Sequence, residues 1–180
     1  MSIGDLVFHG AELLRTTRLT EFSLSMADWP LALWLQSHFY AIPTFQTLHI
    51  LAIAVLFSSS LMLNLRVLGV NGKDLNLEAA LRRFRPWFWW ALVALVASGA
   101  FMLISEPVRN LTNPIFWGKM TLLAIGILAT LRFQAAIRHR MATWDVSPAG
   151  HASLRSGAVA LTILWCLVIA GGRWIAYAPI

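Results

Sequence analysis

Four long apolar runs constrain the fold of this chain more than any other feature of its sequence. An α-helix rises about 1.5 Å per residue, so about 20 apolar residues cross the roughly 30 Å of hydrocarbon in a bilayer. The four runs are close to that length and lie at Pro43–Leu65, Trp87–Ile104, Ile115–Leu131 and Ala158–Tyr177. The sequence therefore predicts an all-α fold, an integral membrane four-helix bundle.

The composition agrees with a membrane protein. Only 12% of the 180 residues are charged and 58% are hydrophobic, whereas soluble domains carry about 25% charged residues. The net charge of +6 does not indicate nucleic-acid binding, because the basic residues lie mostly between the apolar runs and not along one stripe. The lipid bilayer is thus the expected surrounding, and no nucleic-acid partner is expected.

The residues before the first run form a separate segment. We expect residues 1–42 to hold a polar tail and an interfacial helix, and residues 43–180 to form the transmembrane domain. The stretch Trp29–Tyr40 is apolar and aromatic but too short to span, which is typical of a helix lying in the membrane interface. Prolines at positions 43, 86 and 114 predict that three of the spanning helices start near them.

The basic residues predict the orientation. Nine of the 14 lie in or beside the loops between runs one and two and between runs three and four: Arg66, Lys73, Arg82, Arg83, Arg85, Arg132, Arg138, Arg140 and Arg155. Positively charged loops stay in the cytoplasm. We therefore expect a multi-pass protein of a bacterial inner membrane with both termini outside.

Ionisable side chains inside a span are costly, so each is a candidate for function. His49 follows Pro43 by six residues and Lys119 follows Pro114 by five, which places both about 8–9 Å into their helices. Arg173, far along a helix that rises outward, comes near the same face. His38 lies on the interfacial segment above them.

This set of residues predicts haem b. Haem iron takes imidazole ligands, and its propionates pair with cations. We interpret His38 and His49 as the metal ligands and Lys119 and Arg173 as cofactor-binding residues of an electron-transfer protein with a redox partner. Two alternatives stay open: a copper or small-solute handling protein, and a structural subunit of a larger complex. Whether the chain is an enzyme is left open.

The two histidines are eleven residues apart, which on one unbroken helix separates them by about 16 Å. Pro43 disfavours helical geometry at Ile42. If the chain bends at 41–44, His38 and His49 can face one another across one haem; otherwise each needs another partner. We expect a homo-oligomer, because a four-helix bundle offers little interior for a large cofactor.

Weaker signals lie elsewhere. His139 and His151 lie in a predicted cytoplasmic loop, where a second site is conceivable. The predicted spans contain no Asp or Glu, which argues against a proton-coupled transporter.

Short motifs resemble those of an uncharacterised bacterial four-helix membrane family that carries a domain-of-unknown-function label. They are Thr47–Leu51, Asn64–Gly69, Pro86-Trp87, Ser98-Gly99, Asn113–Met120, Trp144-Asp145 and Gly172–Ile175. The likeness covers about residues 43–178. It implies the four-helix fold and singles out His49, Lys119 and Arg173, but it implies no activity.

The chain departs from that family's pattern at two positions. Asn64 stands where the family often has Asp, and Gln134 stands where it often has His. A ligand role for that second His is thus lost here. More distantly, the third run is similar to the copper-resistance D membrane domain and to b-type cytochrome bundles.

Overall fold

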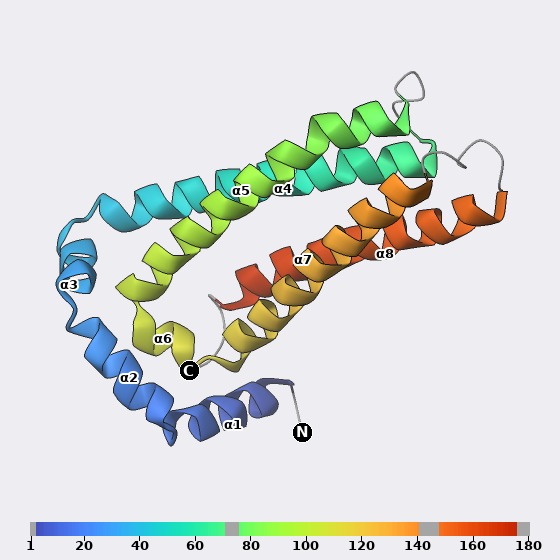
Figure 1. The fold of residues 1–180 in the computed structure, drawn as a ribbon. Helices are drawn as coiled ribbons and strands as arrows, with labels where there is room; N and C mark the ends of the chain where they lie inside the picture. Colours follow the sequence, from blue (N-terminus) through green and yellow to red (C-terminus); the bar gives the residue numbers. More distant parts are fainter. Residues whose placement is uncertain (1–2, 71–75, 141–147, 176–180) are drawn as a thin grey trace. The chain divides into compact units, whose positions relative to one another are not determined.

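The computed structural model describes residues 3–70, 76–140 and 148–175. These ranges are helical and hold no strand, in the order α1 (Ile3–Arg15), α2 (Arg18–Ala27), α3 (Pro30–Ser37), α4 (Ala41–Leu68), α5 (Leu77–Ser105), α6 (Pro107–Leu111), α7 (Pro114–Arg140) and α8 (Pro148–Trp174) (Figure 1). The predicted all-α fold is confirmed.

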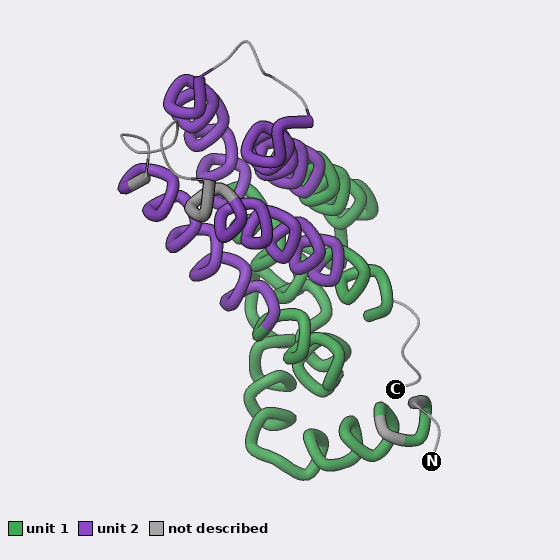
Figure 2. Tube along the Cα trace, turned by 90° about the vertical axis from the view of Figure 1, so that its right-hand side faces the viewer, with its two compact units in different colours: residues 1–51, 94–121, 169–180 green, residues 52–93, 122–168 purple. Residues whose placement is uncertain are grey.

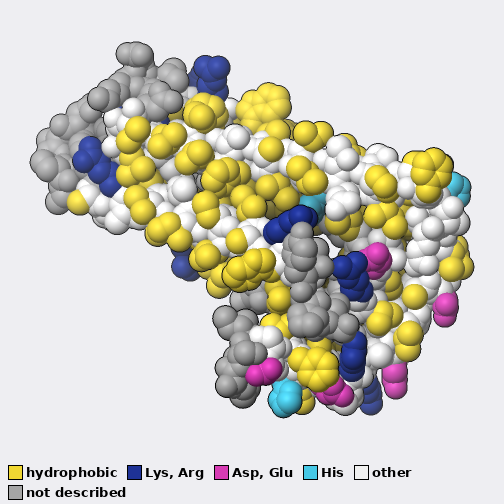
Figure 3. Space-filling model, turned by 180° about the vertical axis from the view of Figure 1, so that it is seen from behind, with side chains coloured by type: hydrophobic (Ala, Val, Ile, Leu, Met, Phe, Trp, Pro, Cys, Tyr) yellow, Lys and Arg dark blue, Asp and Glu magenta, His cyan; other side chains and the backbone are white. Residues whose placement is uncertain are grey.

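Four of the helices are long and apolar enough to cross a membrane: α4, α5, α7 and α8. Only 28–33% of the residues in their most apolar windows are buried inside the protein. Hydrophobic side chains cover much of the face drawn in Figure 3. An apolar surface of this extent needs lipid around it, so the chain is a multi-pass membrane protein.

Local signals set the helix ends. α7 begins at a proline, whose missing N–H costs nothing in a first turn. α4 ends at Leu68, and Gly69 directly after it takes a positive φ of 76°. There the N–H of Gly69 bonds to the carbonyl of Arg66, and the N–H of Val70 bonds to that of Leu65, the two bonds of a Schellman motif.

Two predictions about prolines are wrong. Pro86 lies inside α5 and does not start it. The helix begins nine residues earlier, because the side-chain oxygen of Asn76 accepts the N–H of Ala79 at 2.7 Å and caps the first turn. Pro43 does not break the chain at Ile42, which is helical within the first turn of α4.

The chain divides into two compact units, coloured in Figure 2. Unit 1 comprises residues 1–51, 94–121 and 169–180, and unit 2 comprises residues 52–93 and 122–168. Each long helix thus contributes one stretch to each unit. The predicted division at residue 42 stays a prediction.

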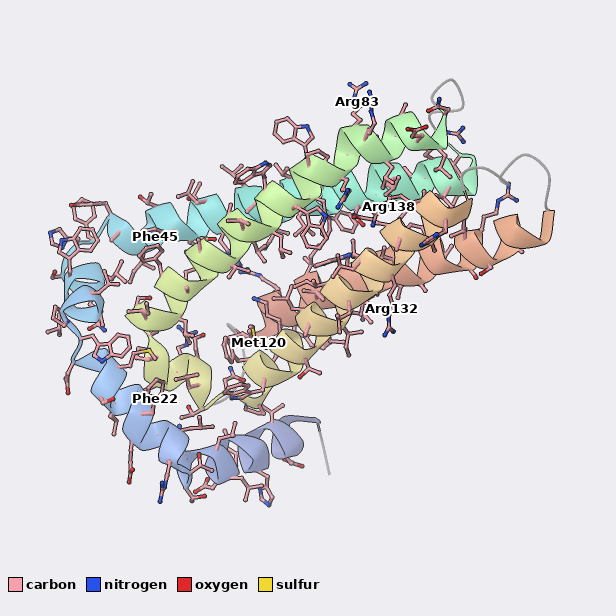
Figure 4. The ribbon with its side chains drawn as sticks, in the orientation of Figure 1. Phe22, Phe45, Arg83, Met120, Arg132 and Arg138 are labelled. Carbon is pink, nitrogen blue, oxygen red and sulfur yellow. The ribbon has the colours of Figure 1, made fainter. Side chains whose placement is uncertain are left out.

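Unit 1 holds the short helices, of which α1, α2 and α6 had no counterpart in the prediction. α2 packs against α6. Gln36 of α3 donates to the carbonyl of Ser105 at the end of α5, with 2.9 Å between the atoms. Phe45 of α4 (labelled in Figure 4) stacks on Phe101 of α5 at a ring distance of 4.3 Å. The predicted interfacial helix corresponds to α3, and its place in the interface stays a prediction.

Side-chain hydrogen bonds join the four long helices within unit 2. Asn64 of α4 donates to Thr162 of α8 at 2.8 Å. Trp89 of α5 donates to Gln134 of α7, and Trp165 of α8 donates to Thr130 of α7, each at 3.2 Å. By contrast, Arg83 and Arg132 are exposed and point away from the helices (Figure 4).

Candidate functional site

His49 is the best-defined candidate. It lies on α4, half-buried, with its Nδ1 2.9 Å from the hydroxyl oxygen of Ser98 on α5. That hydroxyl has a single proton, and the carbonyl of Ala94 lies 2.7 Å from it as acceptor. Ser98 therefore accepts a hydrogen bond from Nδ1–H of His49. In this tautomer the lone pair of the imidazole is on Nε2.

Gly99 follows Ser98 on α5 and also lies against the ring of His49. A Cβ atom placed on Gly99 would lie 3.3 Å from Cε1 of His49 and 3.7 Å from its Nδ1. Such a contact is tight, so a larger residue at Gly99 would press on the ring. The glycine permits the close approach of the imidazole to α5 that the bond to Ser98 requires.

His38 follows the last residue of α3. Its ring stacks on Trp34 at a centroid distance of 4.7 Å, and its Nδ1 lies 2.8 Å from the carbonyl oxygen of Trp34 and 3.0 Å from the hydroxyl of Ser37. A carbonyl only accepts, so Nδ1 of His38 carries the proton. His38 and His49 thus share one property: each has Nδ1 hydrogen-bonded and Nε2 left as the nitrogen that can ligate a metal.

The two predicted cations lie on α7 and α8. Lys119 is half-buried on α7. A Cβ on Gly172 would lie 3.5 Å from the Lys119 ammonium nitrogen, so this side chain extends along the α8 backbone. Arg173 is the next residue of α8 and is exposed.

Unit 1 contains all four predicted site residues, and it brings Lys119 close enough to His49 for the ammonium charge to act on the imidazole. Their direct contacts differ. His49 contacts α5, His38 contacts the end of α3, and Lys119 contacts α8. The chain turns at 38–40, upstream of the expected bend, because α4 already starts at Ala41. Whether His38 and His49 share one iron stays a prediction.

The remaining histidines offer less. His139 is exposed in the last turn of α7, and the side chain of His151 lies outside the described residues, so a second site there stays untested. Within those residues, no three His, Cys, Asp or Glu side chains gather in a way that could hold a metal ion by themselves.

Sequence reasoning missed two features of the structure. One is Ser98 as the partner of His49, although it is the one polar residue of its predicted span. The other is a small cavity in unit 2, which Asn64 and Gln134 both line. These are the two positions at which the chain departs from the family pattern.

The helices and their apolar surfaces define a multi-pass helical membrane protein with a half-buried, hydrogen-bonded histidine in its first span. The DUF6644 family of unknown function matches residues 36–178. The chain belongs to this family, which agrees with the predicted resemblance to an uncharacterised four-helix membrane family. No curated protein and no solved structure matches the chain.

Proposed function

We propose that the chain is a membrane-bound b-type haem protein that passes electrons near the outer face of the membrane. The observation that carries the proposal is the state of His49: its Nδ1–H is held by Ser98 and its Nε2 is left with a lone pair. Histidines that ligate metals almost always donate their other ring N–H to a neighbouring acceptor, which fixes the ring and raises its basicity. Absorption spectroscopy of the purified protein tests the proposal.

Two histidines, His38 and His49, suit haem better than they suit a bare metal ion. The macrocycle supplies four ligands to its iron, so one or two protein imidazoles complete the site. A zinc site in a protein needs three or four side-chain ligands. His49 or His38 would hold the iron, and bound haem supplies one-electron redox chemistry. The alternatives, copper or solute handling and a structural subunit, have no comparable set of contacts in the described residues.

Lys119 and Arg173 would hold the propionates. Both are cations on helix stretches of unit 1, and Lys119 is half-buried although it is charged. An anion close to its ammonium group would offset the cost of that burial. The role of the two residues is to bind and orient the cofactor by charge. The predicted homo-oligomer and redox partner remain part of the proposal.

We expect Lys119→Met to weaken haem binding by on the order of tenfold, because a charge-assisted hydrogen bond contributes about 1.5–3 kcal/mol. The methionine keeps much of the side-chain volume against Gly172. The position of the Soret band should not change, since the axial ligands are untouched. Haem titration of the apoprotein measures both quantities, and a shifted band would contradict the assignment of Lys119 to the propionates. Arg173→Ala should act in the same direction.

We also propose that the chain lies in a bacterial inner membrane with both termini outside. The residue ranges of unit 2 contain nine basic and three acidic residues, whereas those of unit 1 contain five of each. Reporter fusions after Gly72 and after Ala149 should therefore report the cytoplasm, and a fusion after Asn110 should report the outside. The opposite pattern would move the histidine site to the cytoplasmic face.

A further inference from the structure

We propose that the small cavity of unit 2 that Asn64 and Gln134 line binds one water molecule, which donates a hydrogen bond to the side-chain oxygen of Asn64. Five polar side chains line this cavity, and each is more than nine-tenths buried: Ser59, Ser60, Asn64, Thr130 and Gln134. They come from α4 and α7, and all lie in unit 2. The proposal does not depend on haem.

The orientation of the Asn64 amide follows from its neighbour. The hydroxyl of Thr162 donates to the carbonyl of Ala158 at 2.9 Å, so its oxygen is left to accept. It accepts the Nδ2–H of Asn64 at 2.8 Å. The other atom of the amide group is therefore the oxygen, and a flipped amide would lose this bond.

The oxygen of Asn64 is left without a protein donor in the described residues, although Asn64 is only 1% exposed. The Thr130 hydroxyl does not supply one, because it donates to the carbonyl of Gly126 at 2.7 Å. Buried acceptors in proteins are nearly always paired, with protein or with ordered water. We therefore expect a bound ligand to donate an O–H or N–H hydrogen bond to the side-chain oxygen of Asn64.

The size and charge of the cavity select water. The cavity offers about 10 Å³ to the centre of a water molecule, about the space that one buried water needs. Arg85 is its only charged lining residue, and a cation is disfavoured beside a guanidinium. A water here has the polar partners that such molecules require, because serine hydroxyls and the Gln134 amide line the same space.

Hydroxyl-radical footprinting by X-ray radiolysis of the full chain in lipid nanodiscs tests the proposal, because radicals form from bound water and oxidise adjacent side chains. Leu63 lines the cavity and is 4% exposed, whereas Val67, one turn further on α4, is 1% exposed and does not line it. After correction for intrinsic reactivity, we expect Leu63 to be oxidised several-fold faster than Val67.

Asn64→Leu removes the acceptor and should reduce oxidation of Leu63 to the rate of Val67. The comparison of Leu63 with Val67 in the wild type stands even if this variant fails to fold. Equal, low rates at the two residues in the wild type would overturn the proposal. A tightly bound hydroxylated lipid, detected by native mass spectrometry, would also overturn the proposal if Leu63 became reactive only after the lipid was removed.

Discussion

Replacement of His49 by alanine is expected to abolish haem binding. The substitution removes an axial ligand, and α4 contains no other His, Cys or Met within a turn of position 49. The purified variant from haem-replete cells should lack the Soret band that the wild type shows. Its far-ultraviolet circular dichroism should be unchanged, because His49 is only half-buried and the helix around it is strongly apolar.

His139→Ala is the matched control for His49→Ala, since His139 is exposed in the last turn of α7. This variant should keep the full haem content.

His38→Ala tests whether His38 is the second axial ligand. Loss of the band in this variant would place both histidines on one iron, and an unchanged spectrum would remove His38 from the site. A His49→Ala protein with wild-type haem content would contradict the ligand assignment.

Ser98→Ala is expected to weaken haem binding strongly. This change leaves the imidazole in place but removes the acceptor of its Nδ1–H, which lies 2.9 Å away. Loss of such an outer partner costs about 10–100-fold in metal affinity. We therefore expect haem to dissociate from this variant 10–100-fold more readily, as measured by transfer to apomyoglobin, and its reduction potential to rise as the imidazole becomes less basic.

Ser105→Ala provides the control for that experiment. Ser105 lies on the same helix, is 4% exposed like Ser98, and donates to a carbonyl one turn back, that of Met102. It differs in that its hydroxyl does not contact His49. If Ser105→Ala and Ser98→Ala lose haem equally, the effect of Ser98 is a general one of helix packing and not one of ligand orientation.

The sequence predicts the four spans well because their signal is the length of an apolar run, which needs no knowledge of tertiary contacts. It does not predict α1 and α2, whose residues are mixed in polarity, nor α6, which has five residues. The start of α5 is missed for a related reason. A capping Asn76 and a charged first turn begin the helix outside the apolar run, so hydropathy alone places the start at Pro86.

The candidate site is predicted only in outline. Counting residues along a helix gives the depth of His49 and Lys119, and that count needs only the rise per residue. It does not give Ser98, because the pairing depends on which faces of α4 and α5 meet, and that is decided by packing along both helices. The cavity near Asn64 is missed for the same reason: it is lined by residues from separate helices that unit 2 brings together.

Whether the protein binds haem is decided by the absorption spectrum of the wild-type protein, purified from haem-replete cells. We expect a red protein with a Soret band and, on reduction, sharp bands in the visible region that report imidazole-ligated iron. A colourless protein with intact helical structure, which also fails to take up added haem, would contradict this expectation.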